Sequence, residues 1–313
     1  RNAAAGGLDV HGATAYVTLE PCSHQGRTGP CCDALIHAGI RRVVASIADP
    51  NPLVAGQGFA RLRAAGIEVE VGPGAAISRE LNIGFFSRMQ RGMPWVRMKA
   101  AASLDGFTAL PNGNSQWITS AEARADGHAW RARACAVLTG IGTIVADDPR
   151  LDVREAPTPR QPHLAIADGS LQTPPHARLF DVPGRKVFIY AKGDADTTRA
   201  VALRARGAEI VFAPERDGHL DLHWVLQDLA RQRSVNELHV EAGARLNGAL
   251  LRDRLVDEVL LYQAPTLLGA GLGLAAWGPL DELSQALPLE FHSVDRIGAD
   301  LRIVARGLRR ADF

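Results

Sequence analysis

Three cysteines near the start of the chain have the residue type and the spacing to bind a metal ion. Cys22 and Cys31 are separated by eight residues, and Cys32 follows directly. Thiolates are good zinc ligands, and Cys22 lies just after a predicted strand over 13–19, at the edge where open parallel sheets bind ligands. Two cysteines at this spacing are also consistent with ordinary packing. The residue types alone leave a zinc site and a structural loop both open.

A catalytic zinc site needs more than two thiolates. In zinc-dependent base deaminases a His-x-Glu element supplies the third ligand and the carboxylate that moves protons. The 21 residues before Cys22 contain no His-x-Glu. Because the chain begins with Arg1 rather than Met, we expect that residues upstream of it are absent from this sequence.

Glycines at junctions between strands and helices form a second group of candidates. Gly140 and Gly142 follow one predicted strand, and Gly243 follows another. Glycine lets the backbone approach a phosphate closely, and the amide groups at the start of a helix suit a pyrophosphate, to which Arg245 can add a positive charge. The first junction is not the Gly-x-Gly-x-x-Gly fingerprint, so a Rossmann domain is not predicted. Tight strand-to-helix turns remain the alternative.

The elements that must position these residues form two successive α/β series. Strands and helices alternate between residues 13 and 71, which predicts a parallel sheet, and a helix is predicted over 76–89. A second series runs from a strand over 95–102 to antiparallel strands between 258 and 306. The turn at 91–94 is the predicted domain boundary.

Bulk composition limits the functional classes. Of the 313 residues, 46% are hydrophobic and 22% charged, as in soluble globular proteins. The net charge of +1 gives no electrostatic reason to bind nucleic acid or an anionic membrane. The longest nearly apolar run, 134–146, is too short to cross a bilayer. Few cysteines and the lack of a signal segment favour the cytoplasm.

The motifs together resemble one known family. The stretch TAYVTLEPCSHQGRTGPC, from Thr14 to Cys31, resembles the deaminase domain of the bifunctional riboflavin-biosynthesis deaminase–reductases. The later segments KAAASLDGFTA, GIGTIVADDPRL and VEAGARLNGA resemble the reductase half in order and spacing. The resemblance implies a cytidine-deaminase-like three-layer α/β domain over residues 1–91. A dihydrofolate-reductase-like α/β domain is expected over residues 92–313.

In the first domain the resemblance implies that Cys22 and Cys31 bind zinc. It gives Cys32 no role and places His24 in the substrate loop, although His24 remains an alternative ligand. The family's His-Ala-Glu motif is expected just upstream of Arg1, so no catalytic residue for deamination is assigned within the chain. We therefore expect negligible deamination from these 313 residues, and the zinc itself can be lost.

In the second domain the resemblance implies an NADPH site and a substrate site. The expected NADPH-binding residues are Ala101, Trp117, Thr143, Asp147, Gly169, Gly243, Ala244, Arg245, Leu246, Asn247, Gly248 and Ala249. The expected substrate-binding residues are Lys99, Ser115, Arg131, Leu151, Arg154 and Glu241. Arginine suits a ribose-phosphate substrate because its guanidinium binds phosphate through two hydrogen bonds. Taken alone, Trp117 is typical of packing and Arg131 of a solvated helix face.

Some positions depart from the family pattern without removing a group that the chemistry needs. Phe107 stands where arginine is common, and Asp152 where a hydroxyl residue is usual. Gly169 takes the place of a serine that often contacts the cofactor, and Gly29 replaces a common proline. A cofactor contact at Gly169 would therefore have to come from its backbone.

The sequence thus predicts a cytoplasmic, homo-oligomeric enzyme of riboflavin biosynthesis that acts on a small pyrimidine ribosyl phosphate. The implied reactions are zinc-dependent deamination and NADPH-dependent reduction of the ribosyl group to a ribityl chain. Two alternatives stay open. One is a reductase-only enzyme with a structural deaminase relic, and the other is a non-catalytic nucleotide-binding protein with a structural zinc loop.

Overall fold

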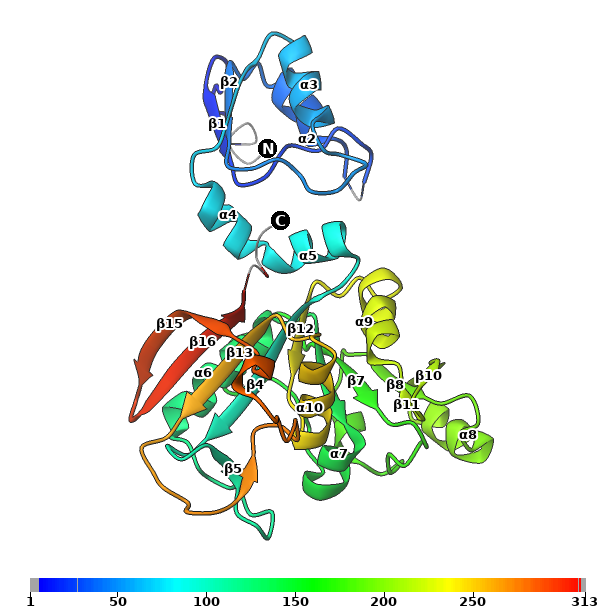
Figure 1. Cartoon of the computed structure of the whole chain (residues 1–313). Coiled ribbons are helices and arrows are strands. Elements are labelled where there is room, and N and C mark those ends of the chain that lie inside the picture. The colour runs from blue at the N-terminus through cyan, green and yellow to red at the C-terminus, as the bar shows by residue number, and fades with distance from the viewer. Residues whose placement is uncertain (1–5, 27, 309, 311–313) are drawn as a thin grey trace. The chain divides into compact units, whose positions relative to one another are not determined.

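The chain divides into two compact units, residues 1–91 and 92–313 (Figure 1). The computed structural model describes residues 6–26, 28–308 and 310. Each unit contains a sheet of parallel strands. Within the described part of the chain, no helix is long and apolar enough to cross a membrane.

The first unit contains a three-stranded parallel sheet in the order β1-β2-β3. Its elements are β1 (Thr14–Val17), α2 (Cys31–His37), β2 (Arg42–Ala45), α3 (Gln57–Ala64), β3 (Glu68–Val71), α4 (Ala75–Leu81) and α5 (Ile83–Arg91). Parallel neighbours need a crossover, which α2 and α3 provide. Cys32 of α2 and Leu62 of α3 pack with Val43 of β2 in the core.

A buried carboxylate holds the loop that carries Cys22. The side chain of Glu20 accepts hydrogen bonds of 2.9–3.3 Å from four backbone N–H groups, those of Asp49, Gly56, Gly58 and Phe59. A Cβ atom on Gly58 would lie 1.9 Å from the carbonyl oxygen of Pro21, so this close approach requires glycine. The strand end at Glu20 and the start of α3 are therefore fixed to one another.

The single helix predicted over 76–89 is wrong, because two helices, α4 and α5, occupy this stretch. The break falls at Asn82, whose side-chain amide donates a 2.8 Å hydrogen bond to the carbonyl oxygen of Ser78. Asparagine side chains compete in this way with the backbone ladder of a helix. Apolar spacing alone does not reveal that competition.

The second unit contains a nine-stranded sheet in the order β15-β16-β13-β4-β12-β6-β7-β8-β9. Its strands are β4 (Trp95–Ala102), β6 (Ala136–Gly140), β7 (His163–Ala167), β8 (Val187–Ala191), β9 (Ala208–Phe212), β12 (Glu237–Val240), β13 (Glu258–Gln263), β15 (Leu289–Ile297) and β16 (Asp300–Gly307). Neighbours from β13 to β9 are parallel, whereas β16 and β15 run antiparallel, as predicted for the end of the chain.

Helices cover both faces of this sheet. The helices are α6 (Ala121–Arg133), α7 (Ile141–Asp147), α8 (Thr197–Ala205), α9 (Leu222–Arg231) and α10 (Ala244–Arg252), with short 3₁₀ turns η1 (Arg178–Asp181) and η2 (Leu283–Gln285). Successive residues of one strand point to opposite faces. Leu138 accordingly packs with Leu226 of α9 and Leu250 of α10, whereas Val137 packs with Ile144 of α7.

Two short antiparallel pairs, absent from the sequence prediction, complete the unit. They are β10 (Glu215–Arg216) with β11 (His219–Leu220), and β5 (Phe107–Ala109) with β14 (Leu272–Gly273). Asp105 anchors the chain ahead of β14, since its carboxylate accepts from the N–H groups of Leu268 and Gly269 at 3.1 and 2.7 Å. Each pair is too short to show a strand pattern in sequence.

Candidate active site

A cavity of about 770 Å³ opens in the second unit at the carboxyl ends of β4, β6 and β12. Parallel α/β sheets bind ligands at this edge, because α7 and α10 begin there with free backbone N–H groups. Its polar and charged lining includes Lys99, Ser115, Gln116, Thr119, Arg124, His128, Arg131, Thr143, Asp147, Asp148, Arg150, Arg154, Glu155, Arg178, Glu241 and Asn247.

The cavity brings together residues that are far apart in sequence. All six expected substrate-binding residues line it, from Lys99 to Glu241. The expected NADPH-binding residues that line it are Ala101, Trp117, Thr143, Asp147, Gly243, Ala244 and Asn247.

The other five expected NADPH-binding residues lie outside the lining: Gly169, Arg245, Leu246, Gly248 and Ala249. Leu246 and Ala249 pack against the core. A Cβ atom on Gly248 would lie 2.1 Å from the carbonyl oxygen of Ala276. The structure thus gives these three residues of α10 packing contacts.

A buried ion pair lies at the centre of the cavity wall. Arg131 of α6 donates two hydrogen bonds to the carboxylate of Glu241, of 2.6 and 2.8 Å. Burial alone would raise the Glu241 pKa, but the Arg131 guanidinium and nearby His239 hold that pKa well below its usual value. Glu241 is therefore ionised, and its bidentate partner fixes it in one orientation.

Lys99 and His239 are two further titratable residues whose pKa values are influenced by Arg131 and Glu241. Burial lowers the pKa of the Lys99 amine, with Glu241 opposing and Arg131 reinforcing that shift. His239 is fully buried, and its Nε2 lies 3.3 Å from Glu241 Oε1. Burial lowers the His239 pKa as well, so this ring is neutral near pH 7.

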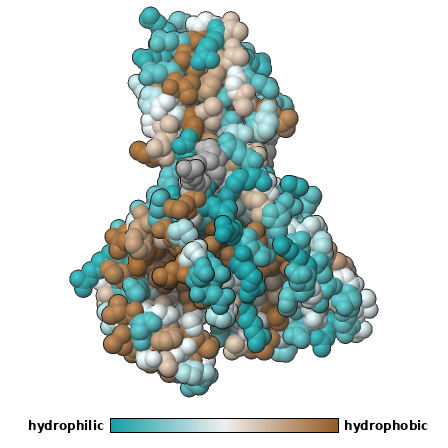
Figure 2. Space-filling model, viewed as in Figure 1, coloured by the Kyte–Doolittle hydropathy of each residue, from teal (hydrophilic) through white to brown (hydrophobic). Residues whose placement is uncertain are grey.

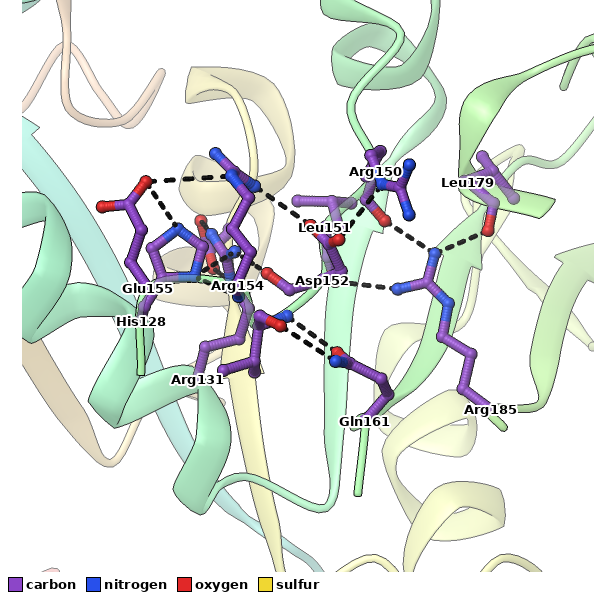
Figure 3. Close-up of polar contacts among 12 residues, drawn as sticks. His128, Arg131, Arg150, Leu151, Asp152, Arg154, Glu155, Gln161, Leu179 and Arg185 are labelled. Carbon is purple, nitrogen blue, oxygen red and sulfur yellow. Dashed lines mark hydrogen bonds and ion pairs between the residues drawn. The ribbon is translucent and has the colours of Figure 1, made fainter. Parts of the chain in front are cut away.

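An arginine-rich turn forms another part of the wall (Figure 3). The carboxylate of Asp152 bridges two arginines, with Arg150 Nε at 3.1 Å and an Arg154 terminal nitrogen at 3.0 Å. His128 Nδ1 faces the backbone N–H of Arg154 at 3.4 Å. Burial, and then repulsion from Arg131 and Arg154, lowers the His128 pKa to about 4. The departure from a hydroxyl residue at position 152 thus adds a charged bridge.

The residues present fit a dinucleotide phosphate cofactor. Gly243 caps α10 without a side-chain hydrogen bond, and a Cβ atom there would face only Thr143 Oγ1 at 4.0 Å. A Cβ on Gly142 would meet nothing within 4 Å. The Oδ1 atom of Asn247 is buried without a partner among the described residues, which leaves an acceptor available to a ligand. Open backbone at the start of a helix suits a pyrophosphate.

An aromatic side chain stands at the cavity mouth. Trp117 is 65% exposed although it lines the cavity, and the Arg124 guanidinium lies 4.5 Å from its ring centroid. A ring held in this way by a cation offers its free face to a planar heterocycle. The position argues against the packing role that Trp117 suggests by residue type alone.

In the first unit, the described residues supply two thiols of the expected zinc site. The backbone N–H of Cys31 lies 3.4 Å from the sulfur of Cys22, so the two cysteines are neighbours. Among residues 6–26, 28–308 and 310, no group of three His, Cys, Asp or Glu side chains is arranged to hold a metal, and His24 therefore does not complete one. Cys32 donates to the carbonyl oxygens of Pro21 and Gly58, and burial raises its pKa to about 11, which fits packing.

Several lining residues were not anticipated from the sequence: His128, Arg150, Glu155 and Arg178. His128 precedes Arg131 by three residues, so the two share one face of α6, and helical periodicity could have identified it. The remaining three lie in turns or in η1, whose side-chain directions no periodic pattern encodes.

Comparisons with known proteins agree with this architecture. A family model described as the RibD C-terminal domain matches residues 94–303, and one described as the cytidine and deoxycytidylate deaminase zinc-binding region matches residues 1–47. The riboflavin biosynthesis protein RibD of Escherichia coli is 44% identical over 94% of this chain and 82% of its own length. The RibD of Aquifex aeolicus is 37% identical over 95% of this chain and 81% of its own length.

Solved structures give the same result. One form of Acinetobacter baumannii RibD superposes with a TM-score of 0.85 at 38% identity, over 95% of this chain and 82% of that one. A deaminase/reductase from Thermotoga maritima superposes with a TM-score of 0.84 at 28% identity, over 98% of this chain and 82% of that one. The expected fold class, a deaminase-like unit followed by a reductase-like unit, is confirmed.

Proposed function

Because the chain belongs to the RibD family of riboflavin-biosynthesis proteins, we propose that residues 92–313 form its reductase domain and residues 1–91 its deaminase domain. The chain is an enzyme of riboflavin biosynthesis, of the class that combines pyrimidine deamination with reduction, and its cofactors are zinc and NADPH. The reductase-only and binding-only alternatives are not favoured, since both halves match their family models.

The observation that carries the reductase assignment is the gathering of all six expected substrate residues around one cavity. Glu241, ionised and held by Arg131, accepts hydrogen bonds from the N–H and O–H groups of the substrate. Arg154, 52% exposed, is one side chain that can bind the substrate phosphate. Ser115 and the backbone of Leu151 complete the lining of the substrate site.

The part of the cavity lined by α7, α10 and Trp117 would hold the cofactor. When bound, NADPH supplies the hydride that converts the ribosyl ring to a ribityl chain. The first turn of α10, from Gly243, offers its N–H groups to the pyrophosphate, and Thr143 and Asp147 approach from α7. Lys99 also lines this cavity, and we propose that its side chain contacts the sugar of the substrate.

In the deaminase domain Cys22 and Cys31 are the proposed zinc ligands. Zinc held there would supply an activated water for hydrolytic deamination. The described residues provide two of the ligands and no third, so we assign these cysteines a ligand role only.

The substrate is a small pyrimidine ribosyl phosphate, and no nucleic-acid partner is proposed, since the net charge is +1. We place the enzyme in the cytoplasm, in keeping with its few cysteines. A homo-oligomer is supported by apolar side chains on β15, where Phe291 is 75% and Val294 53% exposed. Figure 2 shows apolar residues gathered over this part of the second unit. Light scattering of the purified chain measures its subunit number, and a monomer would contradict the proposal.

Two assays on this polypeptide test the function directly. The first follows NADPH oxidation with the deaminated pyrimidine ribosyl phosphate, and turnover is the expected result. The second follows ammonia release from the diaminopyrimidine precursor. Oxidation without ammonia would support a working reductase domain, and ammonia release would show a complete zinc site. Binding of NADPH without oxidation would contradict the reductase assignment.

A further inference from the structure

The side chain of Arg185 donates hydrogen bonds to backbone carbonyl groups, two of which belong to residues that line the cavity. It lies in the turn before β8, outside the cavity lining. One terminal nitrogen donates to the carbonyl oxygen of Leu151 at 2.8 Å, and the other donates to those of Arg150 and Leu179, each at 2.7 Å (Figure 3). Arginines of this kind usually pair with a carboxylate. No carboxylate takes a hydrogen bond from Arg185 among the contacts of the described residues.

The two clamped carbonyl groups belong to the peptide units on either side of Leu151. Fixing both units fixes the backbone conformation of Leu151, which has a φ of +50°. That left-handed conformation is unfavourable for a residue with a bulky side chain. The side chain of Leu151 is meanwhile buried in the core with Leu179. Arg185 and the core contact together hold a conformation that the local sequence disfavours.

The clamp sets the direction of neighbouring groups. In a trans peptide the N–H points opposite to the carbonyl group, so holding the Arg150 carbonyl against Arg185 turns the Leu151 N–H away from Arg185. The turn continues through Asp152, which bridges the Arg150 and Arg154 side chains at 3.1 and 3.0 Å. Arg150, Leu151 and Arg154 all line the cavity. One partly buried side chain therefore orients a turn that presents two guanidinium groups.

These two arginines suit the phosphate better than Arg131 does. Arg131 is 11% exposed and already donates to both oxygens of Glu241 and to the backbone carbonyl of Asp152. Arg150 and Arg154 are 38% and 52% exposed, so a dianion can reach them from solvent. Burial lowers the pKa of Arg185 to about 10, which leaves it charged at neutral pH and adds positive potential behind the turn.

We propose that Arg185 is a positioning residue for phosphate recognition, which fixes the 150–154 turn so that Arg150, Arg154 and the Leu151 N–H converge on the substrate phosphate. The inference rests on the proposed reductase function for its substrate. It assigns Arg185 no contact with substrate or NADPH. Its effect should therefore be confined to ligands that carry the phosphate.

The test is Arg185→Gln in the full chain, assayed with the phosphorylated substrate and with its dephosphorylated counterpart. We expect KM for the phosphorylated substrate to rise about tenfold, with kcat changed less than about threefold. KM for the dephosphorylated substrate should change less than about twofold, because that ligand does not use the turn. A purely structural role would affect both substrates and NADPH binding alike, so the dissociation constant of NADPH is measured as well.

Two further variants sharpen the result. Arg185→Lys keeps the charge but loses the planar fork, so we expect partial rescue, with KM between those of wild type and Arg185→Gln. Arg160→Gln is the matched control, because Arg160 also donates to a backbone carbonyl, that of Ala134, and lies outside the cavity lining. Its kinetics should equal those of wild type. If Arg185→Gln fails to fold, the inference is tested instead by comparing KM of Arg185→Lys for the phosphorylated and dephosphorylated substrates.

A binding measurement separates this inference from the proposed function. Calorimetry measures the affinity of each variant for ribose 5-phosphate, with ribose as the comparison that lacks the phosphate. If wild type binds ribose 5-phosphate but does not oxidise NADPH with the pyrimidine ribosyl phosphate, the reductase proposal fails, whereas weaker binding of ribose 5-phosphate by the Arg185 variants still supports the clamp. An equal rise in KM for both substrates, or unchanged binding of ribose 5-phosphate by Arg185→Gln, would overturn the inference.

Discussion

At the scale of single residues, the reductase cavity depends on charges that are buried in pairs. Arg131 and Glu241 come from α6 and from the end of β12, and each is less than 15% exposed. A buried pair contributes little net stability, but removing one partner leaves an uncompensated charge in a low-dielectric site. We therefore expect changes to this pair to affect both folding and the proposed substrate binding.

Replacing Glu241 tests this dependence. We expect Glu241→Gln to lower the free energy of unfolding by about 3 kcal/mol, because Arg131 loses its ionised partner. Reductase kcat/KM should fall by at least about a hundredfold. Urea denaturation and NADPH oxidation measure the two effects. Glu215→Gln is the control, since Glu215 pairs with Lys192 at 39% exposure and should cost less than about 0.5 kcal/mol.

The pH dependence of stability follows from buried histidine. The pKa of His128 is lowered from 6.5 to about 4, first by burial. Between these two values the unfolded chain binds more protons than the folded one, so stability present above pH 6.5 is lost as pH falls toward 4. The loss attributable to His128 is about 3 kcal/mol as an upper bound.

Denaturation of His128→Asn from pH 7 to pH 4 measures this contribution. The variant should lose less stability over the window than wild type does. The pKa values of His163 and His239 are lowered in the same direction, so some pH dependence will persist. Identical pH profiles for variant and wild type would contradict the assignment.

At the scale of elements, α10 combines proposed cofactor-binding residues with packing contacts. Its first turn faces the cavity, whereas Gly248, in its middle, touches the backbone at Ala276. The position of the helix is therefore constrained by a backbone contact at a residue outside the cavity lining. Segment 264–276 is in turn anchored by Asp105 through the N–H groups of Leu268 and Gly269.

A methyl group on Gly248 should displace this helix. We expect Gly248→Ala to destabilise the protein by about 2 kcal/mol and to weaken NADPH binding by about tenfold, because a Cβ atom would lie 2.1 Å from a backbone oxygen. Thermal unfolding and fluorescence titration with NADPH measure the two. Gly193→Ala is the control, since its Cβ would meet nothing within 4 Å. Normal NADPH binding by Gly248→Ala would show that a displacement at Gly248 does not reach the first turn of α10.

At the scale of the whole molecule, the two compact units carry separate chemistry. The proposed zinc ligands lie in residues 1–91, and every residue that lines the reductase cavity lies in residues 92–313. Each unit has its own hydrophobic cluster. Such an arrangement lets one activity be altered without the other.

Loss of the thiols should therefore spare the reductase. We expect Cys22→Ser combined with Cys31→Ser to abolish zinc binding, measured by atomic emission, and to change NADPH-dependent kcat and KM less than about twofold. Cys135→Ser, in the second unit, is the control for cysteine loss. A large fall in reductase activity in the double variant alone would show that the units are coupled.

Much of the architecture follows from local sequence. The strand over 95–102 was predicted with the bounds that β4 has, because the spacing of apolar residues is a local signal. The Gly243 junction and the substrate residues were also found, since glycine and arginine in these positions match a known family. Substrate and cofactor roles for them stay predictions until the assays above are done.

Only the tertiary structure decided which of these residues meet. Arg131 and Glu241 are 110 residues apart, and Arg185 reaches back 34 residues to Leu151. The backbone at Ala276 leaves no room for a side chain at position 248, and the residues next to Gly248 in the sequence do not reveal this contact. Sequence determines the period, caps and turns of each element, which depend on residues a few positions away. Side-chain pairing across the cavity depends on how the sheet stacks distant strands, and no local pattern contains that information.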